Sequence, residues 1–520
     1  MLGKLKLVKY TLCLAIAISG VALVKQVSTG AERIDFNLSV LGFTVKVADL
    51  AAFAETGEVS DSLNYYFRYL PPKQTKQLRQ FLNQSYNVDP VLVYRYSRTT
   101  AGIKMLQRIG DIIQLPGNIN GFYGLRAAVV QTAQSPEGIN LIDFLQRFPT
   151  DIKLNLGELL KLMGQIENAE ADTQEFIASL SLSKTLIPKQ LADISELGNY
   201  QVQQQTLDLY DSQRDRHLVT DLYLPQGSVD SIPVIVVSNG LGAKRDRFEE
   251  LAHSLASHGF GVVIPDHPGS DRNRQKAFLD GLYKENFATT DYIDRPLDIS
   301  FILNRLEQVN EENYNDLLNL KQVGLFGYSI GGTTGLSLAG AKFDFERLER
   351  DCAQPLNLLN ISILYQCRAL ELTEPKVSLL DERIAAAYLF VPFGNSIFAA
   401  SQNEITIPIM FQVVDRDFLT SLLEEQVPLF NSLGGDSYLV ISEQLPHSNV
   451  TLSNEAQSTQ AAASQVAKTY QNILSLAFFR SYILGNHNYR AYLSPSGLKA
   501  ISQEPYNLHL MRSQSAQNDG

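Results

Sequence analysis

The sequence predicts an α/β protein in which a mostly parallel sheet follows a mainly helical N-terminal domain. Beyond about residue 200, short apolar runs alternate with segments of helical periodicity. This alternation is typical of a parallel sheet that helices cover on both faces. Residues 32–185 show mainly the helical period. The hydrophobic content of 45% and the charged content of 19% are ordinary for a globular protein with real cores.

The N-terminal domain begins with an alternating stretch, RIDFNLSVLGFTVKV, which predicts a hairpin over residues 33–47. The helical pattern follows, and Asp89-Pro90 supplies a natural N-cap and first-turn pair for one helix. The stretch SLSKTLIPKQLADISELGNY, residues 181–200, separates this pattern from the next and predicts a linker.

Residues 200–480 have the pattern of a second domain. The stretch IPVIVVSNG at 232–240 is almost entirely apolar, as expected of a strand buried on both faces. Further strands are predicted at 201–210, 217–225, 260–269, 322–329, 383–393, 407–415 and 437–444. Helices are predicted at 247–259, 295–309, 331–341 and 465–484, with an insertion at 342–382 and a C-terminal extension at 481–520.

The first 31 residues have the pattern of an export signal. Three lysines precede an uncharged run over residues 11–24, and the small residues Thr29 and Ala31 follow it. The run is shorter than the ~20 residues that span a bilayer comfortably. We expect cleavage near Ala31 and a periplasmic or extracellular protein. An N-terminal membrane anchor is the alternative, because Lys25 lies close to the expected cleavage point.

The net charge indicates which binding partners to expect, and the cysteines indicate the cellular compartment. The net charge is −11 and would become −15 after cleavage, because the signal segment holds four lysines and no acid. An acidic surface repels phosphate backbones and anionic lipids, so we expect no nucleic-acid partner and no strong binding to anionic membranes. Outside the signal, Cys352 and Cys367 predict a disulfide in an exported chain, with two buried free thiols as the alternative.

One short motif carries the expected chemistry. The residues Gly327-Tyr328-Ser329-Ile330-Gly331 follow a predicted strand and precede a predicted helix. A G-x-S-x-G motif in that context is typical of a nucleophile elbow, a strained turn that exposes the serine hydroxyl at a helix N-terminus. A Gly-rich turn without chemistry is the alternative. We expect Ser329 to be the nucleophile.

A serine nucleophile needs a base and an acid that orients it. In this kind of site the acid and then the histidine follow the serine along the chain. His447 stands just after the last predicted strand, whereas His487 and His509 lie in the polar tail. Asp417 and Asp415 both follow the strand at 407–415, and we favour Asp417 because it lies further beyond the strand end. Asp415 stays open as the alternative acid.

Two backbone amides are expected to bind the oxyanion. One belongs to Ile330, directly after the nucleophile, and the other to Leu241 in the loop SNGLGAKRDRF, where Gly240 and Gly242 allow close approach. The histidines and acids show no spacing typical of metal ligands, so we expect neither a metal nor another cofactor.

With the motifs NGLG, GYSIGG, DRDF and LPHSN in this order, residues 200–480 resemble an α/β-hydrolase esterase. The stretch SNGLGAKRDRFEELAHSLASHGFGVVIPDHPGSDR is most similar to the dienelactone-hydrolase and platelet-activating-factor-acetylhydrolase branch. The whole layout resembles an exported hydrolase family of cyanobacterial type with a helical N-terminal domain of unknown function. The acetylhydrolase branch draws its acid from the strand after the nucleophile helix, but residues 385–395 contain no acid, which leaves the acid at Asp417.

The motifs predict a serine hydrolase that cleaves carboxylic esters, including lipid-like acyl esters, through an acyl-enzyme. An acyltransferase or thioesterase would use the same residues. A non-catalytic envelope protein that binds a lipid or a partner is the alternative from another class. Residues 356–367, LNLLNISILYQC, are apolar enough either to line an acyl site or to be ordinary core.

Overall fold

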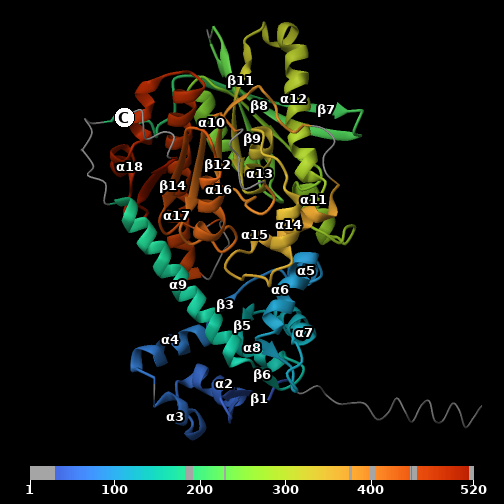
Figure 1. The fold of residues 1–520 in the computed structure, drawn as a ribbon, viewed down its shortest axis with the longest axis vertical. Helices are drawn as coiled ribbons and strands as arrows, with labels where there is room; N and C mark the ends of the chain where they lie inside the picture. The colour runs from blue at the N-terminus through green and yellow to red at the C-terminus, as the bar shows by residue number, and fades with distance from the viewer. Residues whose placement is uncertain are drawn as a thin grey trace, which may run out of the picture. The chain divides into compact units, whose positions relative to one another are not determined.

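The computed structural model describes residues 30–68, 70–181, 191–227, 230–373, 378–398, 405–445, 447 and 454–513. The chain forms two compact units (Figure 1), one of Met1–Val93 and Ile109–Leu160 and the other of Tyr94–Arg108 and Lys161–Gly520. This division differs from the predicted domain limit at residue 185. The predicted export signal lies outside the described residues except for Gly30 and Ala31.

The first unit contains the predicted hairpin. Strands β1 (Arg33–Leu38) and β2 (Leu41–Lys46) pair antiparallel, and β6 (Ile152–Leu154) and β4 (Ile113–Gln114) extend the sheet in the order β2-β1-β6-β4. Two short strands, β3 (Ser85–Tyr86) and β5 (Ile139–Asn140), pair separately. The helices of this unit are α2 (Val47–Thr56), α3 (Asp61–Phe67), α4 (Pro72–Leu82), α7 (Phe122–Thr132) and α8 (Leu141–Arg147).

Three further helices have residues in both units. They are α5 (Pro90–Tyr96), α6 (Thr100–Gly110) and α9 (Leu156–Ser181). The predicted cap of α5 is present, because Asp89 Oδ1 accepts a hydrogen bond of 2.7 Å from the Val91 amide. Helix α9 has 26 residues and mixes charged with apolar positions along its length. Among the described ranges, no helix combines the length and the apolarity that a membrane crossing would need.

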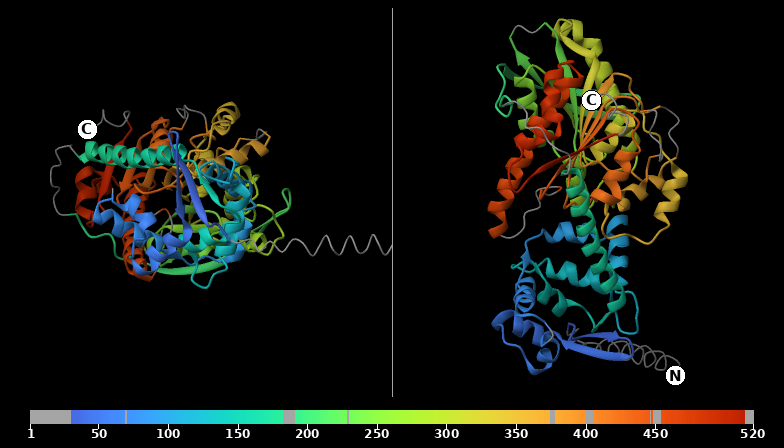
Figure 2. Two further views of the ribbon diagram at one scale, coloured as in Figure 1. Left: turned by 90° about the horizontal axis from the view of Figure 1, so that it is seen from below. Right: turned by 60° about the vertical axis from the view of Figure 1, so that its left-hand side comes forward.

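The second unit is built on a nine-stranded sheet in the order β15-β14-β13-β12-β11-β9-β10-β8-β7. The six strands from β14 to β10 run parallel, and β8, β7 and β15 are antiparallel to their neighbours. The strands are β7 (Gln201–Asp211), β8 (Arg216–Gln226), β9 (Ile232–Ser238), β10 (Gly261–Pro265), β11 (Leu318–Tyr328), β12 (Ile384–Phe390), β13 (Ile409–Val414), β14 (Ser437–Ser442) and β15 (Leu508–Arg512). The right-hand view of Figure 2 shows strands of this sheet.

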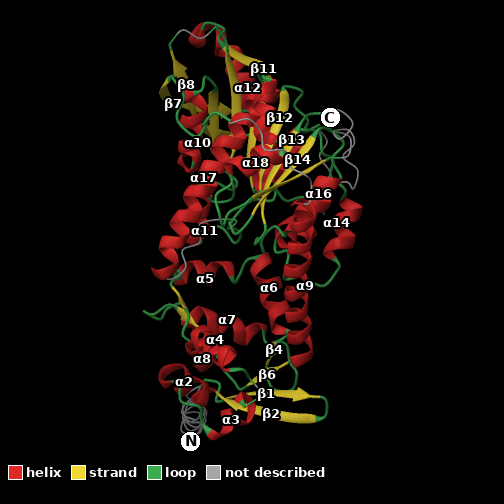
Figure 3. Ribbon diagram, turned by 90° about the vertical axis from the view of Figure 1, so that its left-hand side faces the viewer, coloured by secondary structure: helices red, strands yellow, loops and turns green. Residues whose placement is uncertain are grey.

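Helices cover both faces of this sheet (Figure 3). The side chains of β9 alternate between the two faces, so Val234 packs in one hydrophobic core and Ile235 in the other. The core of Val234 includes α12 (Asp291–Tyr314) and α13 (Ile330–Leu338), and the core of Ile235 includes α10 (Glu249–Ser257) and α17 (Asn454–Tyr482). A mostly parallel sheet with two apolar faces therefore explains the nearly continuous apolar runs of the sequence.

The predicted insertion, residues 342–382, lies between α13 and β12 along the chain. It contains α14 (Phe345–Cys352), α15 (Ser362–Gln366) and η2 (Cys367–Glu371). A disulfide joins Cys352 to Cys367, with 5.6 Å between the two Cα atoms. The remaining short helices are η1 (Arg245–Phe248), α11 (Arg272–Leu279), η3 (Leu422–Gln426), α16 (Val427–Asn431), η4 (His487–Leu493) and α18 (Pro495–Ile501).

The predicted C-terminal extension contributes to the sheet. Strand β15 pairs antiparallel with β14, from Ser442 opposite Leu508 to Tyr438 opposite Arg512. The pairing supplies β14 with hydrogen-bond partners that an edge strand would otherwise lack. The domain thus continues beyond the predicted limit at residue 480.

Candidate active site

Ser329 occupies a strained turn between β11 and α13. Its backbone angles are φ 55° and ψ −118°, a conformation that side-chain-bearing residues rarely adopt. The turn directs the chain from the carboxyl end of a central strand straight into a helix, so Ser329 stands at the helix N-terminus. The helix dipole favours negative charge there.

The two glycines of the motif are required by close packing around Ser329. A Cβ atom on Gly327 would lie 2.4 Å from the carbonyl oxygen of Gly331. A Cβ atom on Gly331 would lie 2.0 Å from the carbonyl oxygen of Ser238, at the end of β9. Any side chain at either position would push α13 away from the sheet, and the spacing of the motif follows from this geometry.

His447 is held by a buried carboxylate. Its Nδ1 lies 2.6 Å from Asp417 Oδ2, and the Asp417 side chain has an exposed fraction of 0%. Asp417 also accepts hydrogen bonds from the Leu419 and Thr420 amides, at 2.8 and 2.9 Å, and from the Thr420 hydroxyl. A carboxylate fixed in this way binds the Nδ1 proton and leaves Nε2 of the imidazole as the basic nitrogen.

The other candidate acid, Asp415, points elsewhere. Its Oδ1 accepts a hydrogen bond of 2.7 Å from the Gln444 amide, in the loop after β14. Burial raises the pKa of Asp415. Of the two acids that the sequence leaves open, the structure brings Asp417 to His447 and keeps Asp415 away from it.

The two expected oxyanion donors belong to the elbow itself and to a loop close to it. Ile330 is the first residue of α13, and Leu241 belongs to the loop after β9. A Cβ atom on Gly240 would lie 2.7 Å from the Tyr328 ring, so this loop passes close to the elbow. In the described part of the chain, neither the Leu241 nor the Ile330 amide donates a hydrogen bond outside regular helix and strand pairing.

Ser329, His447 and Leu241 line one cavity of about 420 Å³. Tyr328, Phe393 and Leu419 supply apolar surface to the same cavity. The cavity has the size and the mixed lining typical of a small-molecule site. Of the insertion residues 356–367, Ser362 and Tyr365 also line it, so this segment contributes to the cavity wall.

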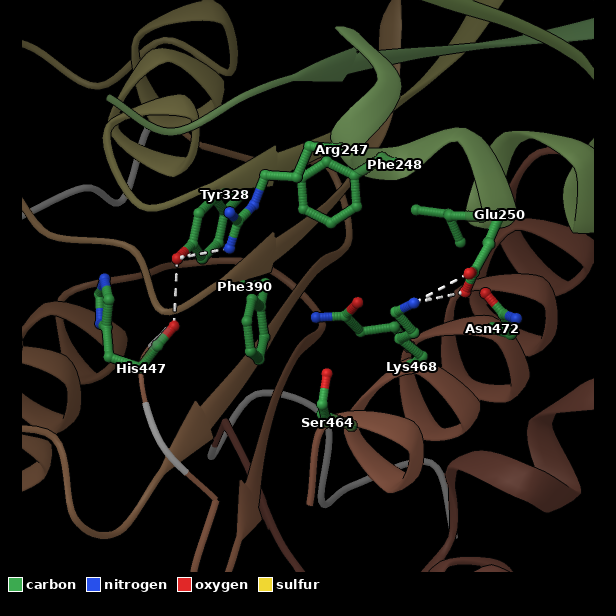
Figure 4. A pocket seen from close by; sticks show the side chains of 12 residues that line it. Arg247, Phe248, Glu250, Tyr328, Phe390, His447, Ser464, Lys468 and Asn472 are labelled. Carbon is green, nitrogen blue, oxygen red and sulfur yellow. Dashed lines mark hydrogen bonds and ion pairs between the residues drawn. The ribbon is translucent and has the colours of Figure 1, made fainter. Parts of the chain in front are cut away.

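Tyr328 fixes the backbone of His447. The Tyr328 hydroxyl donates a hydrogen bond of 3.1 Å to the His447 carbonyl oxygen and accepts one of 3.2 Å from Arg247 (Figure 4). Both Tyr328 and His447 also border a second cavity of about 160 Å³ next to the first. His447 therefore lies between two cavities.

Two family models match this chain. One, described as "Alpha/beta hydrolase of unknown function (DUF1400)", matches residues 30–155, and one described as "alpha/beta hydrolase fold" matches residues 233–344, which include the Leu241 loop and the elbow.

The chain has the α/β-hydrolase fold.

A search of the curated proteins finds no match. The first family match covers residues before the nine-stranded sheet, and the second covers β9 to α13. The narrower resemblance to the dienelactone-hydrolase and acetylhydrolase branch stays a prediction. In the described ranges, no group of three or more His, Cys, Asp or Glu side chains could hold a metal ion.

A second serine, histidine and aspartate set lies inside the α/β-hydrolase fold. Ser238 Oγ is 3.1 Å from His267 Nε2, and His267 Nδ1 is 3.1 Å from Asp298 Oδ2. Ser238 is 0% exposed, and the side chains of His267 and Asp298 are 1% and 0% exposed. No substrate can reach a hydroxyl buried in this way, so we assign this set a structural role.

Arg295, on the same helix as Asp298, fixes the Leu241 loop. Its guanidinium donates a hydrogen bond of 2.5 Å to the Asn239 carbonyl oxygen and bonds Ser270 Oγ at 2.6 and 2.9 Å. The Ser270 carbonyl oxygen in turn accepts a bond of 2.8 Å from the Gly242 amide. The loop is thus fixed on both sides of Leu241, which keeps the Leu241 amide in a constant position.

Replacing His267 with glutamine is expected to weaken the acid-induced loss of stability. Burial lowers the pKa of His267 from 6.5 to about 4. Between these values the unfolded chain binds a proton at this imidazole more readily than the folded protein does. The contribution of His267 to the free energy of unfolding is therefore complete above pH 6.5 and is lost as the pH falls toward 4. Linkage puts this contribution at about 3 kcal/mol.

Urea unfolding of wild type and His267→Gln between about pH 4 and pH 7 measures this difference. Burial raises the pKa of Asp291 to about 6, which acts in the opposite direction, so the comparison of the two proteins is needed to isolate His267. A variant that loses stability on acidification as steeply as wild type would contradict the expectation.

Several residues around the site were not predicted from the sequence. Thr420 donates a hydrogen bond to Asp417, and Arg295 holds the Leu241 loop. Tyr96 and Asn286 line the cavity. A signal existed only for Arg295. It lies on the same face of α12 as Asp291 and Asp298, in line with buried apolar residues of that helix. Buried charges need partners, so charged residues at buried positions of a helix predict a cluster of ion pairs.

Proposed function

We propose that the protein is a serine hydrolase that cleaves carboxylic esters with Ser329 as nucleophile, His447 as base and Asp417 as the orienting acid. The observation that carries the proposal is the strained elbow of Ser329 in one cavity with His447, whose Nδ1 is bound to the buried Asp417. The α/β-hydrolase fold agrees with hydrolase activity, and the residues named above support an ester hydrolase in particular.

Each half of the reaction uses the same groups. Ser329 Oγ attacks the ester carbonyl carbon while His447 Nε2 takes the hydroxyl proton, and the Leu241 and Ile330 amides bind the oxyanion. The C–O bond of the ester then breaks, and the alcohol leaves with the proton from His447. Water attacks the acyl-enzyme in the same way, which releases the carboxylic acid and restores Ser329.

Labelling with a fluorophosphonate tests this proposal on the purified protein. We expect one covalent adduct, on Ser329, because only a serine activated by a base reacts rapidly with the phosphonyl fluoride. Peptide mass spectrometry locates the adduct, and Ser238 serves as an internal control, since it also touches a histidine but is fully buried. A folded protein without an adduct on Ser329 would contradict the proposal.

We further propose that the protein is exported. The Cys352–Cys367 disulfide supports this, because such bonds persist in oxidising compartments. Cell fractionation followed by detection of the chain in the periplasmic or extracellular fraction tests the proposal, and a purely cytoplasmic protein would contradict it.

A further inference from the structure

A buried amide on the wall of the Ser329 cavity has one unpartnered polar atom. Asn286 lines the cavity and is 6% exposed. Its Nδ2 donates a hydrogen bond of 3.2 Å to the Tyr96 hydroxyl. Among the described residues, no group donates to Asn286 Oδ1, which leaves a strong acceptor at the cavity.

The orientation of this amide is set by Tyr96. The Tyr96 hydroxyl can donate to Gln275 Oε1, at 3.4 Å, and therefore accepts from Asn286 Nδ2. The Tyr96 ring packs edge-on against Phe278, with 5.2 Å between ring centroids. Asn286 thus presents its oxygen, rather than its nitrogen, to the cavity.

The segment that carries Tyr96 is fixed to the second unit, to which Tyr94–Arg108 belongs. Arg95 donates a hydrogen bond of 3.1 Å to the Leu279 carbonyl oxygen. The Thr100 hydroxyl and amide donate to Glu285 Oε1 at 2.7 and 2.9 Å, next to Asn286 in the chain. A stretch that the sequence assigns to the N-terminal domain therefore helps to build the cavity.

Tyr365 brings a second unpartnered polar group to the same cavity. Its position on α15 is held by the Tyr292 hydroxyl, which donates to the Tyr365 carbonyl oxygen at 2.9 Å. In the part of the chain that the structure describes, the Tyr365 hydroxyl has no hydrogen-bond partner. Burial raises its pKa, so the hydroxyl keeps its proton and is a donor at neutral pH.

We infer that the cavity recognises a hydroxyl group on the ester substrate through Asn286 and Tyr365, an inference that rests on the proposed function. A hydroxyl both donates and accepts hydrogen bonds, so it matches the free acceptor of Asn286 and the free donor of Tyr365. A plain alkyl chain would displace water from both and leave them unpaired, which costs free energy. Sites with such unpaired groups discriminate strongly against substrates that lack the matching hydroxyl.

Matched pairs of esters test the inference. On the acyl side the pair is p-nitrophenyl hydrocinnamate and its para-hydroxy derivative, and on the alcohol side it is n-butyl butyrate and the monobutyrate of butanediol. Proton release gives kcat/KM for each ester. In at least one pair the hydroxylated ester should be preferred by about tenfold, the difference expected from two hydrogen bonds.

Two variants assign the preference to residues. Tyr365→Phe removes only the hydroxyl, and Asn286→Leu removes the amide, so the preference ratio should fall toward one in each. Tyr314→Phe is the matched control, because the Tyr314 hydroxyl bonds Gln205 and does not line the cavity. Its preference ratio should equal that of wild type.

The outcomes separate this inference from the proposed function. If fluorophosphonate labels Ser329 and esters are cleaved, but neither pair shows a preference, the hydroxyl site is wrong and the esterase stands. The same holds if a preference survives unchanged in Tyr365→Phe. If Ser329 is not labelled and no ester is cleaved, both are wrong.

Discussion

Replacing Ser329 with alanine is expected to lower kcat for ester hydrolysis by on the order of 10⁶-fold. Alanine cannot form the acyl-enzyme, and any remaining rate comes from binding and from the oxyanion donors. The fold should persist, because alanine keeps the Cβ atom and the Ser329 hydroxyl makes no hydrogen bond among the described residues. Initial rates and thermal unfolding of both proteins measure the two effects.

Ser337→Ala is the matched control for this variant. Ser337 lies on the same helix, α13, and is 1% exposed, but it does not line the cavity. Its replacement should leave kcat within about twofold of wild type, as for changes away from a site. A folded Ser329→Ala protein that retains most of its esterase rate would show that another group performs the attack.

Replacing Asp417 with asparagine is expected to lower kcat by about 10³- to 10⁴-fold. Asparagine keeps an oxygen for the Leu419 and Thr420 amides but offers no charge to stabilise the His447 cation, and its amide group favours the wrong tautomer of the imidazole. Steady-state kinetics on the ester that wild type cleaves fastest measure the loss.

The variant Asp415→Asn tests which of the two neighbouring aspartates orients His447. Asparagine can still accept the hydrogen bond from the Gln444 amide, and Asp415 does not contact His447, so kcat should change by less than about threefold. Equal losses in Asp415→Asn and Asp417→Asn would contradict the assignment of the acid. A loss confined to Asp415→Asn would reverse it.

The strained elbow at Ser329 was predictable because its determinants are local. Glycines two positions before and two positions after Ser329, an apolar strand and a following helix are all read from one short stretch. The clashes that side chains at Gly327 and Gly331 would produce explain why the motif requires those positions. The parallel sheet was predictable for a similar reason, since burial on both faces makes each strand apolar throughout.

The cavity was predictable only in part. Residues 356–367 were expected either to line an acyl site or to be ordinary core, and of these Ser362 and Tyr365 line the cavity. Tyr96 comes from a stretch far back in the sequence, whose helical pattern resembles that of its neighbours. Its attachment to Asn286 and Gln275 depends on contacts about 180 to 190 residues apart along the chain, and helical periodicity contains no information on those.

The sequence by itself determined the fold class, the elbow with Ser329, the histidine that follows the last parallel strand, and two candidate acids. These features depend on residue periodicity, on short motifs and on chain order. The tertiary structure decided that Asp417 rather than Asp415 meets His447, that Ser238, His267 and Asp298 are buried, and that Asn286 and Tyr365 face the cavity. The physical reason is that the direction of a side chain at a strand end depends on the path of the loop, and that path is fixed by packing between distant segments.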